Sequence, residues 1–329
     1  MPADEAAKMG QTLAPVSTSD DIPAERDETR GRAVTGSPWL WLALLLIMGL
    51  VVPFVPVPSL EAAIIGAVVL TIIYVVVVVQ FAAQTTRLQL PRNALVLWFV
   101  IALVWWVVLE WVMIERVLGP FNETMREVGA QPSLGQVLLG RTVRTLDNLA
   151  LLCAAVLGGS LVARLITSPN MMGPICAIIA MIDIWGVLLG GPVTQILHKA
   201  PNIAAKAMAA PPTVGAETVS RYVIPQPMIG AGDYLFLGLL FAALHANRMN
   251  WRGAVAWTTP LVIVALLAVT FGIGLLPGLL FIGLGVALPN LKYFQYTREE
   301  KFALLYAAIF VIILTVALYF GVVSLLPKQ

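Results

Sequence analysis

Long apolar segments separated by short polar ones dominate the sequence, and this pattern predicts membrane-spanning helices. A helix rises about 1.5 Å per residue, so about 20 apolar residues cross a hydrocarbon core of about 30 Å. Nine segments approach this length, at residues 38–56, 60–83, 94–118, 149–166, 172–197, 228–246, 254–273, 275–288 and 302–325. The eighth is short and flanked by prolines, so we expect an irregular helix there. The fold class predicted is an all-α membrane protein with about nine transmembrane helices.

The polar connections divide the chain into parts. Residues 1–37 lack the apolar surface needed to fold, so we expect a disordered tail. Residues 134–146 look amphipathic, which predicts a segment at the membrane interface. Residues 200–227 are rich in alanine and proline and read as a loop. The division is therefore a tail (1–37), three helices with a connecting loop (38–148), a central block of five helices (149–289) and an additional C-terminal helix (290–329).

Composition supports a bilayer environment, because 59% of the residues are hydrophobic and only 12% are charged. The formal net charge of +2 is spread over loops and tail, so it gives no reason to expect a nucleic acid or an acidic partner, and we expect no nucleic acid. Lysine and arginine are more frequent in the loops that share a side with the tail. This bias predicts a multi-pass integral membrane protein with its N-terminus inside and the 200–227 loop outside.

Ionisable side chains inside the apolar segments are the candidate functional residues, since each costs about 2.5–3.5 kcal/mol at the bilayer centre. Asp183 lies near the middle of the 172–197 segment, and Asp233 lies near the start of the 228–246 segment. One loop joins these two helices, so we expect them to be antiparallel neighbours whose carboxylates face each other. Glu110 is also deep, as an interhelical carboxylate or as the lining of a polar cavity. Arg164, by contrast, is close enough to a helix end to reach the interface.

Two carboxylates a few ångströms apart share a proton, which is the chemistry of an aspartic protease. One carboxylate takes a proton from water while the other protonates the scissile peptide, and no metal or cofactor is needed. Gly230 and Gly232 would let another backbone approach Asp233 closely. Pro277 would leave a backbone carbonyl free for an extended substrate. Paired carboxylates near the midplane also mark ion pathways, so an ion-coupled transporter stays an alternative.

Three blocks of sequence resemble the presenilin and signal peptide peptidase family of GxGD intramembrane aspartyl proteases. The similarity covers residues 171–289. The blocks are Gly230-Ala231-Gly232-Asp233 followed by Tyr234-Leu235-Phe236, then Ile182-Asp183 with Val187 and Gly191-Pro192, and Pro277-Gly278-Leu279 in the place of the family's Pro-Ala-Leu motif. The chain departs from the family pattern at Ile182, where a tyrosine is common, and at Gly278, where the family has alanine. It also has a further helix, residues 302–325, after the proline-motif helix, with which the family normally ends.

The resemblance implies a presenilin-like bundle in which helices of the 149–289 block carry the protease core. It implies Asp183 and Asp233 as the catalytic dyad, with Gly230, Gly232, Pro277, Gly278 and Leu279 positioning the substrate. The implied substrates are single-pass membrane proteins or signal peptide remnants, cleaved within the lipid bilayer without a cofactor. The implied protein is a divergent, prokaryotic-looking member located in a cytoplasmic membrane. A non-catalytic relative that binds membrane helices is the other alternative.

Overall fold

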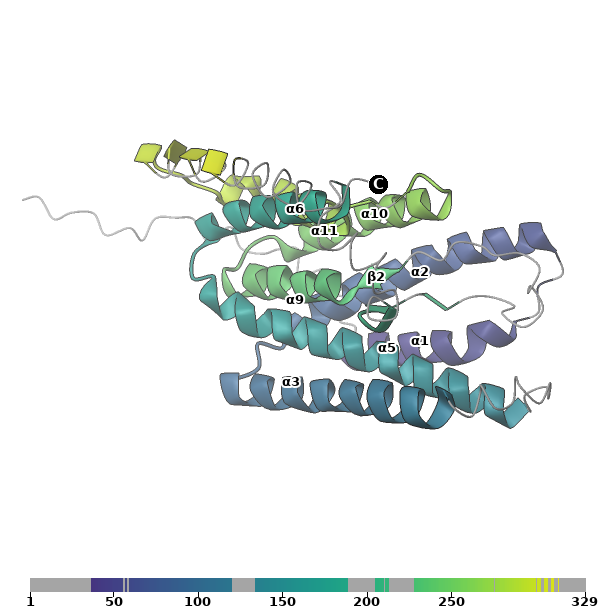
Figure 1. The fold of residues 1–329 in the computed structure, drawn as a ribbon. Helices are drawn as coiled ribbons and strands as arrows, with labels where there is room; N and C mark the ends of the chain where they lie inside the picture. The colour runs from purple at the N-terminus through teal and green to yellow at the C-terminus, as the bar shows by residue number, and fades with distance from the viewer. Residues whose placement is uncertain are drawn as a thin grey trace, which may run out of the picture. The chain divides into compact units, whose positions relative to one another are not determined.

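The structure is a computed structural model, and it describes part of the chain. The described residues are 37–55, 57, 59–119, 134–188, 205–209, 211–212, 228–274, 276–299, 301–302, 305–306, 309–310 and 313. The predicted tail over residues 1–36, most of the 200–227 loop, and Gly191-Pro192 lie outside them. So does most of the predicted last helix. The described part is mostly helical (Figure 1).

Within the described residues, five helices are long and apolar enough to cross a membrane, so the chain is a multi-pass membrane protein. The five spans cover Leu60–Arg87, Arg92–Leu118, Gly135–Leu165, Pro169–Val187 and Trp251–Thr270. Their regular elements are α2 (Leu60–Arg87), α3 (Arg92–Val107) continued by the π-helix η2 (Val108–Leu118), α5 (Leu134–Val162) continued by η3 (Ala163–Leu165), η4 (Pro169–Met171) continued by α6 (Met172–Leu188), and α10 (Trp251–Thr270).

Three apolar helices are shorter than a full span. They are α1 (Pro38–Val51) with the turn η1 (Val52–Phe54), α9 (Ala231–Ala246), and α11 (Gly278–Ala287) with η5 (Leu288–Tyr293). Side chains fix where two of the long helices begin. Ser59 accepts the Ala62 N–H at 3.2 Å at the start of α2, and Asn250 accepts the Gly253 N–H at 2.9 Å at the start of α10.

Helix α9 lies at the centre of the packing, between α5 and α11 in Figure 1, and it also contacts α2 and α10. Between Asp233 and His245 near its two ends, its residues are apolar or aromatic, and Tyr234, Leu240, Phe241 and Leu244 are fully buried, as expected for a helix surrounded by other helices. In contrast, α3 buries one residue, Leu95, and exposes large apolar side chains, as a lipid-facing helix would.

Glycines let α5 and α9 approach until their backbones touch. A Cβ atom on Gly238 would lie 2.7 Å from the Cα of Val156, and one on Gly159 would lie 2.6 Å from the backbone nitrogen of Leu239. Real Cβ atoms do not come this close to backbone, so larger residues would force the helices apart. This contact fixes α9, and with it the position of the residues at its N-terminal end.

The structure corrects several expectations about the elements. The 134–146 segment is not a separate interfacial helix, because it forms the first turns of the continuous helix α5. The division drawn between residues 148 and 149 therefore falls inside a helix. The span expected to begin at residue 228 begins at Ala231, because Ile229–Gly230 form the strand β2, which pairs antiparallel with β1 (Met208–Ala209).

The expected packing of the two aspartate helices is also wrong. Instead of lying side by side, α6 and α9 are both packed against α11. Gly283 of α11 allows this approach on the α6 side, since a Cβ there would already lie 3.2 Å from the Cys176 carbonyl oxygen. The expected count of nine helices stays a prediction.

Candidate active site

Asp183 is hydrogen-bonded to the start of α11. Its Oδ2 accepts the backbone N–H of Leu279 at 2.7 Å. The first N–H groups of a helix have no partner within the helix, so a side chain must satisfy them when the helix end is buried. Asp183 of α6 supplies that partner from a neighbouring helix.

Asp233 is placed by the junction between β2 and α9. It is the third residue of α9, and its Oδ2 accepts the Gly230 N–H at 3.0 Å. This bond folds the carboxylate back over the helix start, as acidic residues at this position often do. Its other oxygen, Oδ1, faces α11, where a Cβ on Gly278 would lie 3.0 Å away.

The two carboxylates therefore lie against consecutive residues of α11, Gly278 for Asp233 and Leu279 for Asp183. The structure brings both acids to one site through α11, and not through direct packing of α6 against α9. Both line one cavity of about 530 Å³.

The rest of that cavity is almost entirely apolar. Its walls come from α2, α6, α9, α10, α11 and the two strands, and its apolar side chains include Val75, Val78, Val79, Leu237, Val262, Ala265, Leu266, Val269 and Ile282. A pocket with this lining and two convergent carboxylates has the make-up of a ligand or active site. An apolar peptide segment is the kind of ligand that it suits.

The residues of the GxGD and proline motifs have different places. Gly230, Gly232, Gly278 and Leu279 line the cavity, whereas Pro277 is buried and forms the N-cap of α11. A Cβ on Gly232 would have no neighbour within 4 Å. The glycine therefore leaves open space beside Asp233. We had expected another backbone to approach here, but no described backbone fills this space.

The residue that departs from the family pattern before the first aspartate does not belong to the cavity lining. Ile182 is 54% exposed and is absent from the residues that line the cavity. The change at Gly278 does matter, because that position touches the Asp233 carboxylate.

Two features of the site escaped sequence analysis. The first is the β1–β2 pair, which lines the cavity beside Asp233 and is extended by the 2.8 Å hydrogen bond from the Ala231 N–H to the Ala207 carbonyl. The second is a buried hydrogen bond of 2.7 Å between the hydroxyls of Tyr74 on α2 and Tyr234, next to Asp233. The β1–β2 pair was missed because a strand of two residues is too short to show a periodic pattern. The tyrosine pair was missed because the apolar sequence around Tyr74 does not indicate a partner 160 residues away.

A second pair of buried acids lies apart from this cavity. Glu110 and Asp147 are 2% and 3% exposed, and Arg144 approaches Glu110 at 3.6 Å. This arrangement matches the expectation of an interhelical carboxylate, since Glu110 belongs to η2 and its partners to α5. Arg164 is at a helix end as expected, donating to the Leu90 carbonyl at 2.5 Å.

No known protein family, curated protein or solved structure matches this chain. Within the described residues, no three histidine, cysteine, aspartate or glutamate side chains are grouped as a metal site. The candidate active site is therefore defined by its geometry: two carboxylates, three motif glycines and a strand pair around an apolar cavity.

Proposed function

We propose that this chain is an intramembrane aspartyl protease of the presenilin and signal peptide peptidase type, with Asp183 and Asp233 as its dyad. The observation that carries the proposal is the placement of both carboxylates against consecutive residues at the start of α11, in one cavity. A third helix that holds two acids from two other helices gives a fixed pair, which general acid–base catalysis requires.

In the proposed reaction the dyad holds one proton between its two carboxyl groups. The carboxylate removes a proton from a water molecule, whose oxygen attacks the carbonyl carbon of the scissile peptide, while the carboxylic acid protonates the carbonyl oxygen. The tetrahedral intermediate then collapses, the C–N bond breaks, and the nitrogen leaves as an amine after taking up a proton. The products are one new carboxyl group and one new amine.

The strand pair supports presentation of the substrate in an extended form. A peptide bond in a helix is shielded by its own hydrogen bonds, so it must unwind before attack. Among the described residues the sheet has two strands, so each strand keeps one edge without a pairing strand. An unwound segment adding to such an edge would satisfy its backbone groups beside Asp233. The proposed substrates are single-pass membrane helices or signal peptide remnants.

The proposal extends to the complete bundle. The five long helices, three shorter ones and the partly described segment after residue 298 are compatible with a presenilin-like arrangement of nine membrane helices. The position of α11, starting at Pro277 and contacting both acids, corresponds to the role that the family resemblance gives to its proline motif.

The test is hydrolysis of a single-pass substrate by the purified protein in detergent, in water enriched in oxygen-18. We expect two fragments, one heavy oxygen in the new carboxyl group, and inhibition by a hydroxyl-containing mimic of the tetrahedral intermediate. An intact substrate after long incubation, or cleavage that ignores the mimic, would overturn the proposal. Unaltered substrate together with ion transport in vesicles would favour the transporter alternative.

Position 278 offers a sharper test of the geometry, because the family has alanine there. In this chain Gly278→Ala would bring a methyl group to 3.0 Å from Asp233 Oδ1, so the carboxylate must shift by a few tenths of an ångström. We expect the hydrolysis rate to fall by roughly tenfold, since small displacements of catalytic groups are costly. The rate is measured at saturating substrate, with Gly140→Ala as control, because a Cβ there meets nothing within 4 Å. Equal rates for both variants would contradict this geometry.

A further inference from the structure

A second cavity, of about 320 Å³, lies on the other side of the strand pair from the two aspartates. Met208 and Met228 line both cavities, so this strand segment is the partition between them. The remaining walls are α1, the turn η1, α2, α5 and the segment Pro211-Pro212. No step of the proposed hydrolysis uses this cavity.

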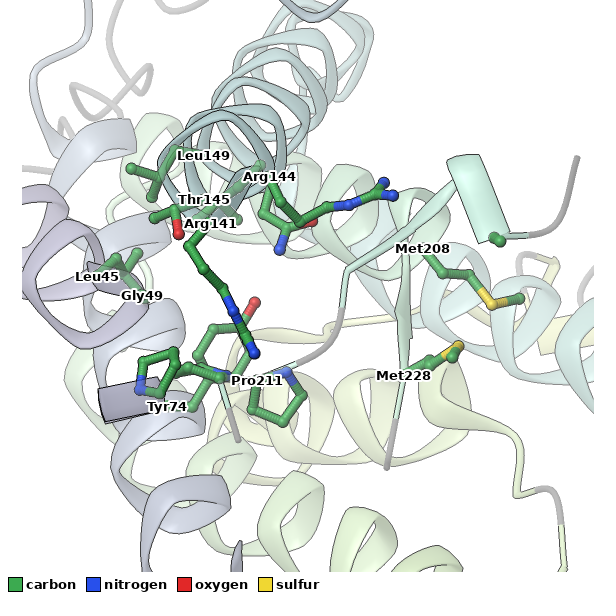
Figure 2. Close-up of a pocket in the computed structure, with 15 residues that line it drawn as sticks. Leu45, Gly49, Tyr74, Arg141, Arg144, Thr145, Leu149, Met208, Pro211 and Met228 are labelled. Carbon is green, nitrogen blue, oxygen red and sulfur yellow. The ribbon is translucent and has the colours of Figure 1, made fainter. Parts of the chain in front are cut away.

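One face of α5 gives the second cavity its polar character. Arg141, Arg144, Thr145 and Asn148 all line it, and their spacing places them on the same side of the helix. In Figure 2 the side chain of Arg141 extends from α5 across the cavity toward Pro211, and Arg144 extends toward Met208. The tyrosine of the buried pair, Tyr74, also contributes to the lining.

Among the described residues that line the cavity, Arg141 is a positive charge without a carboxylate in contact with it. Arg144 is offset by Glu110, whose carboxylate lies 3.6 Å from its guanidinium. Arg141 is half-buried, and in the described part of the chain it has no ion-pair or hydrogen-bond partner. A guanidinium held partly out of water without a partner favours binding of an anion, and its planar donors fit a phosphate in particular.

The position of the cavity in the fold indicates where such an anion comes from. Arg141 lies about 10 Å along α5 from the start of the helix, by the rise per residue, so it is near the depth of lipid headgroups and not at the midplane. Leu45, Leu149 and Leu152 give the same cavity an apolar wall. The neighbouring helix α1 exposes Trp39, Ile47 and Val51 on its outer side, as a lipid-facing helix does. One charged wall and one apolar wall match a phospholipid headgroup with the top of its acyl chains.

We propose that this cavity binds the phosphodiester group of an anionic phospholipid, with Arg141 as the main partner of the phosphate and Thr145 and Asn148 as further donors. A guanidinium in a cavity between membrane helices can pair with the phosphate of such a headgroup through charge-assisted hydrogen bonds. The net charge of one phosphodiester balances Arg141, whereas a zwitterionic lipid would bring a second cation to a site that already has one. The site goes beyond the proposed proteolysis, and its occupation requires no hydrolysis.

The test measures lipid bound to the purified full chain by native mass spectrometry, in detergent with phosphatidylglycerol, phosphatidylcholine or inorganic phosphate. We expect one phosphatidylglycerol per chain, weaker binding of phosphatidylcholine, and no competition by millimolar phosphate. Arg141→Gln should weaken phosphatidylglycerol binding by roughly tenfold or more, since hydrogen bonds to charged groups are the strong ones. This variant is preferred to changes at Arg144, which would strand the buried Glu110 carboxylate.

Arg116→Gln is the matched control, because Arg116 is exposed at the end of η2 and lines neither cavity. It should bind lipid like the unchanged chain, and both variants should keep the same melting temperature. Equal lipid binding by Arg141→Gln and the unchanged chain would overturn the proposal, as would an equal loss in Arg116→Gln. Displacement by inorganic phosphate would assign the site to a soluble anion instead. A raised KM for acidic substrates in Arg141→Gln, with lipid binding unchanged, would assign it to the substrate.

Discussion

Replacement of either Asp183 or Asp233 by asparagine is expected to lower hydrolysis of a single-pass substrate by about 10²- to 10⁴-fold, the usual contribution of general acid–base groups. Asparagine keeps the shape of the side chain, and its amide oxygen can still accept the N–H of Leu279 or of Gly230. It cannot take a proton from water or donate one as an acid. The initial rate of fragment formation measures the effect.

Two further variants make this result specific. The double replacement should be little worse than either single one, because residues that act as a unit are not additive. Asp147→Asn serves as the control, since Asp147 is also a buried acid in a spanning helix but lies outside the cavity. Full hydrolysis by Asp233→Asn, or an equal loss in Asp147→Asn, would show that the dyad is not the catalytic group.

The sequence predicted several of the long spans and part of the site. Asp183 and Asp233 were singled out because ionisable side chains are costly in an apolar chain, whereas Gly278 and Leu279 came from the family resemblance, and all four line one cavity. The cost of burying a charge is a local property, so it can be read without knowing the fold. The sequence did not predict that α11 contacts both acids, because the packing partners of a helix depend on which helix faces come together in the folded protein.

The Arg141 cavity shows why other features escaped prediction. A search for uninterrupted apolar residues placed the start of the fourth helix at Leu149 and assigned 134–146 to the interface. In the structure these residues belong to α5, and three of them, Arg141, Arg144 and Thr145, line a cavity. The spacing of Arg141, Arg144, Thr145 and Asn148 on one helical face was the available signal. A membrane helix with one polar face satisfies that pattern as well as an interfacial helix does.

Gly238→Val is expected to destabilise the fold strongly, by about 1–3 kcal/mol or more, the range for overpacked cores. The added side chain would overlap the backbone of Val156, and neither helix can bend aside because α9 is enclosed by α2, α5, α10 and α11. A flexible side chain could rotate away from such an overlap, whereas backbone cannot. We expect a lower melting temperature in detergent.

The same replacement at a glycine with free space separates packing from helix propensity. A Cβ on Gly140 of α5 meets nothing within 4 Å, so Gly140→Val should melt within a few degrees of the unchanged chain. If Gly238→Val were as stable as Gly140→Val, the close backbone contact between α5 and α9 would be wrong. Because α9 carries Asp233, hydrolysis should fall together with stability in Gly238→Val and stay unchanged in Gly140→Val.

The short length of α9 has a consequence for where a substrate would be cut. At about 1.5 Å per residue its 16 residues cover about 24 Å, less than the hydrocarbon thickness of about 30 Å. The C-terminal end of α9 leads to the exposed Arg248, and an arginine of this kind belongs at a membrane surface. The helix therefore fails to reach the membrane surface at its other end, where Asp233 lies. Asp233 thus lies below the opposite membrane surface, at a depth that the length of α9 sets. A protease built this way would select the scissile bond by its depth in the bilayer as well as by the side chains around it.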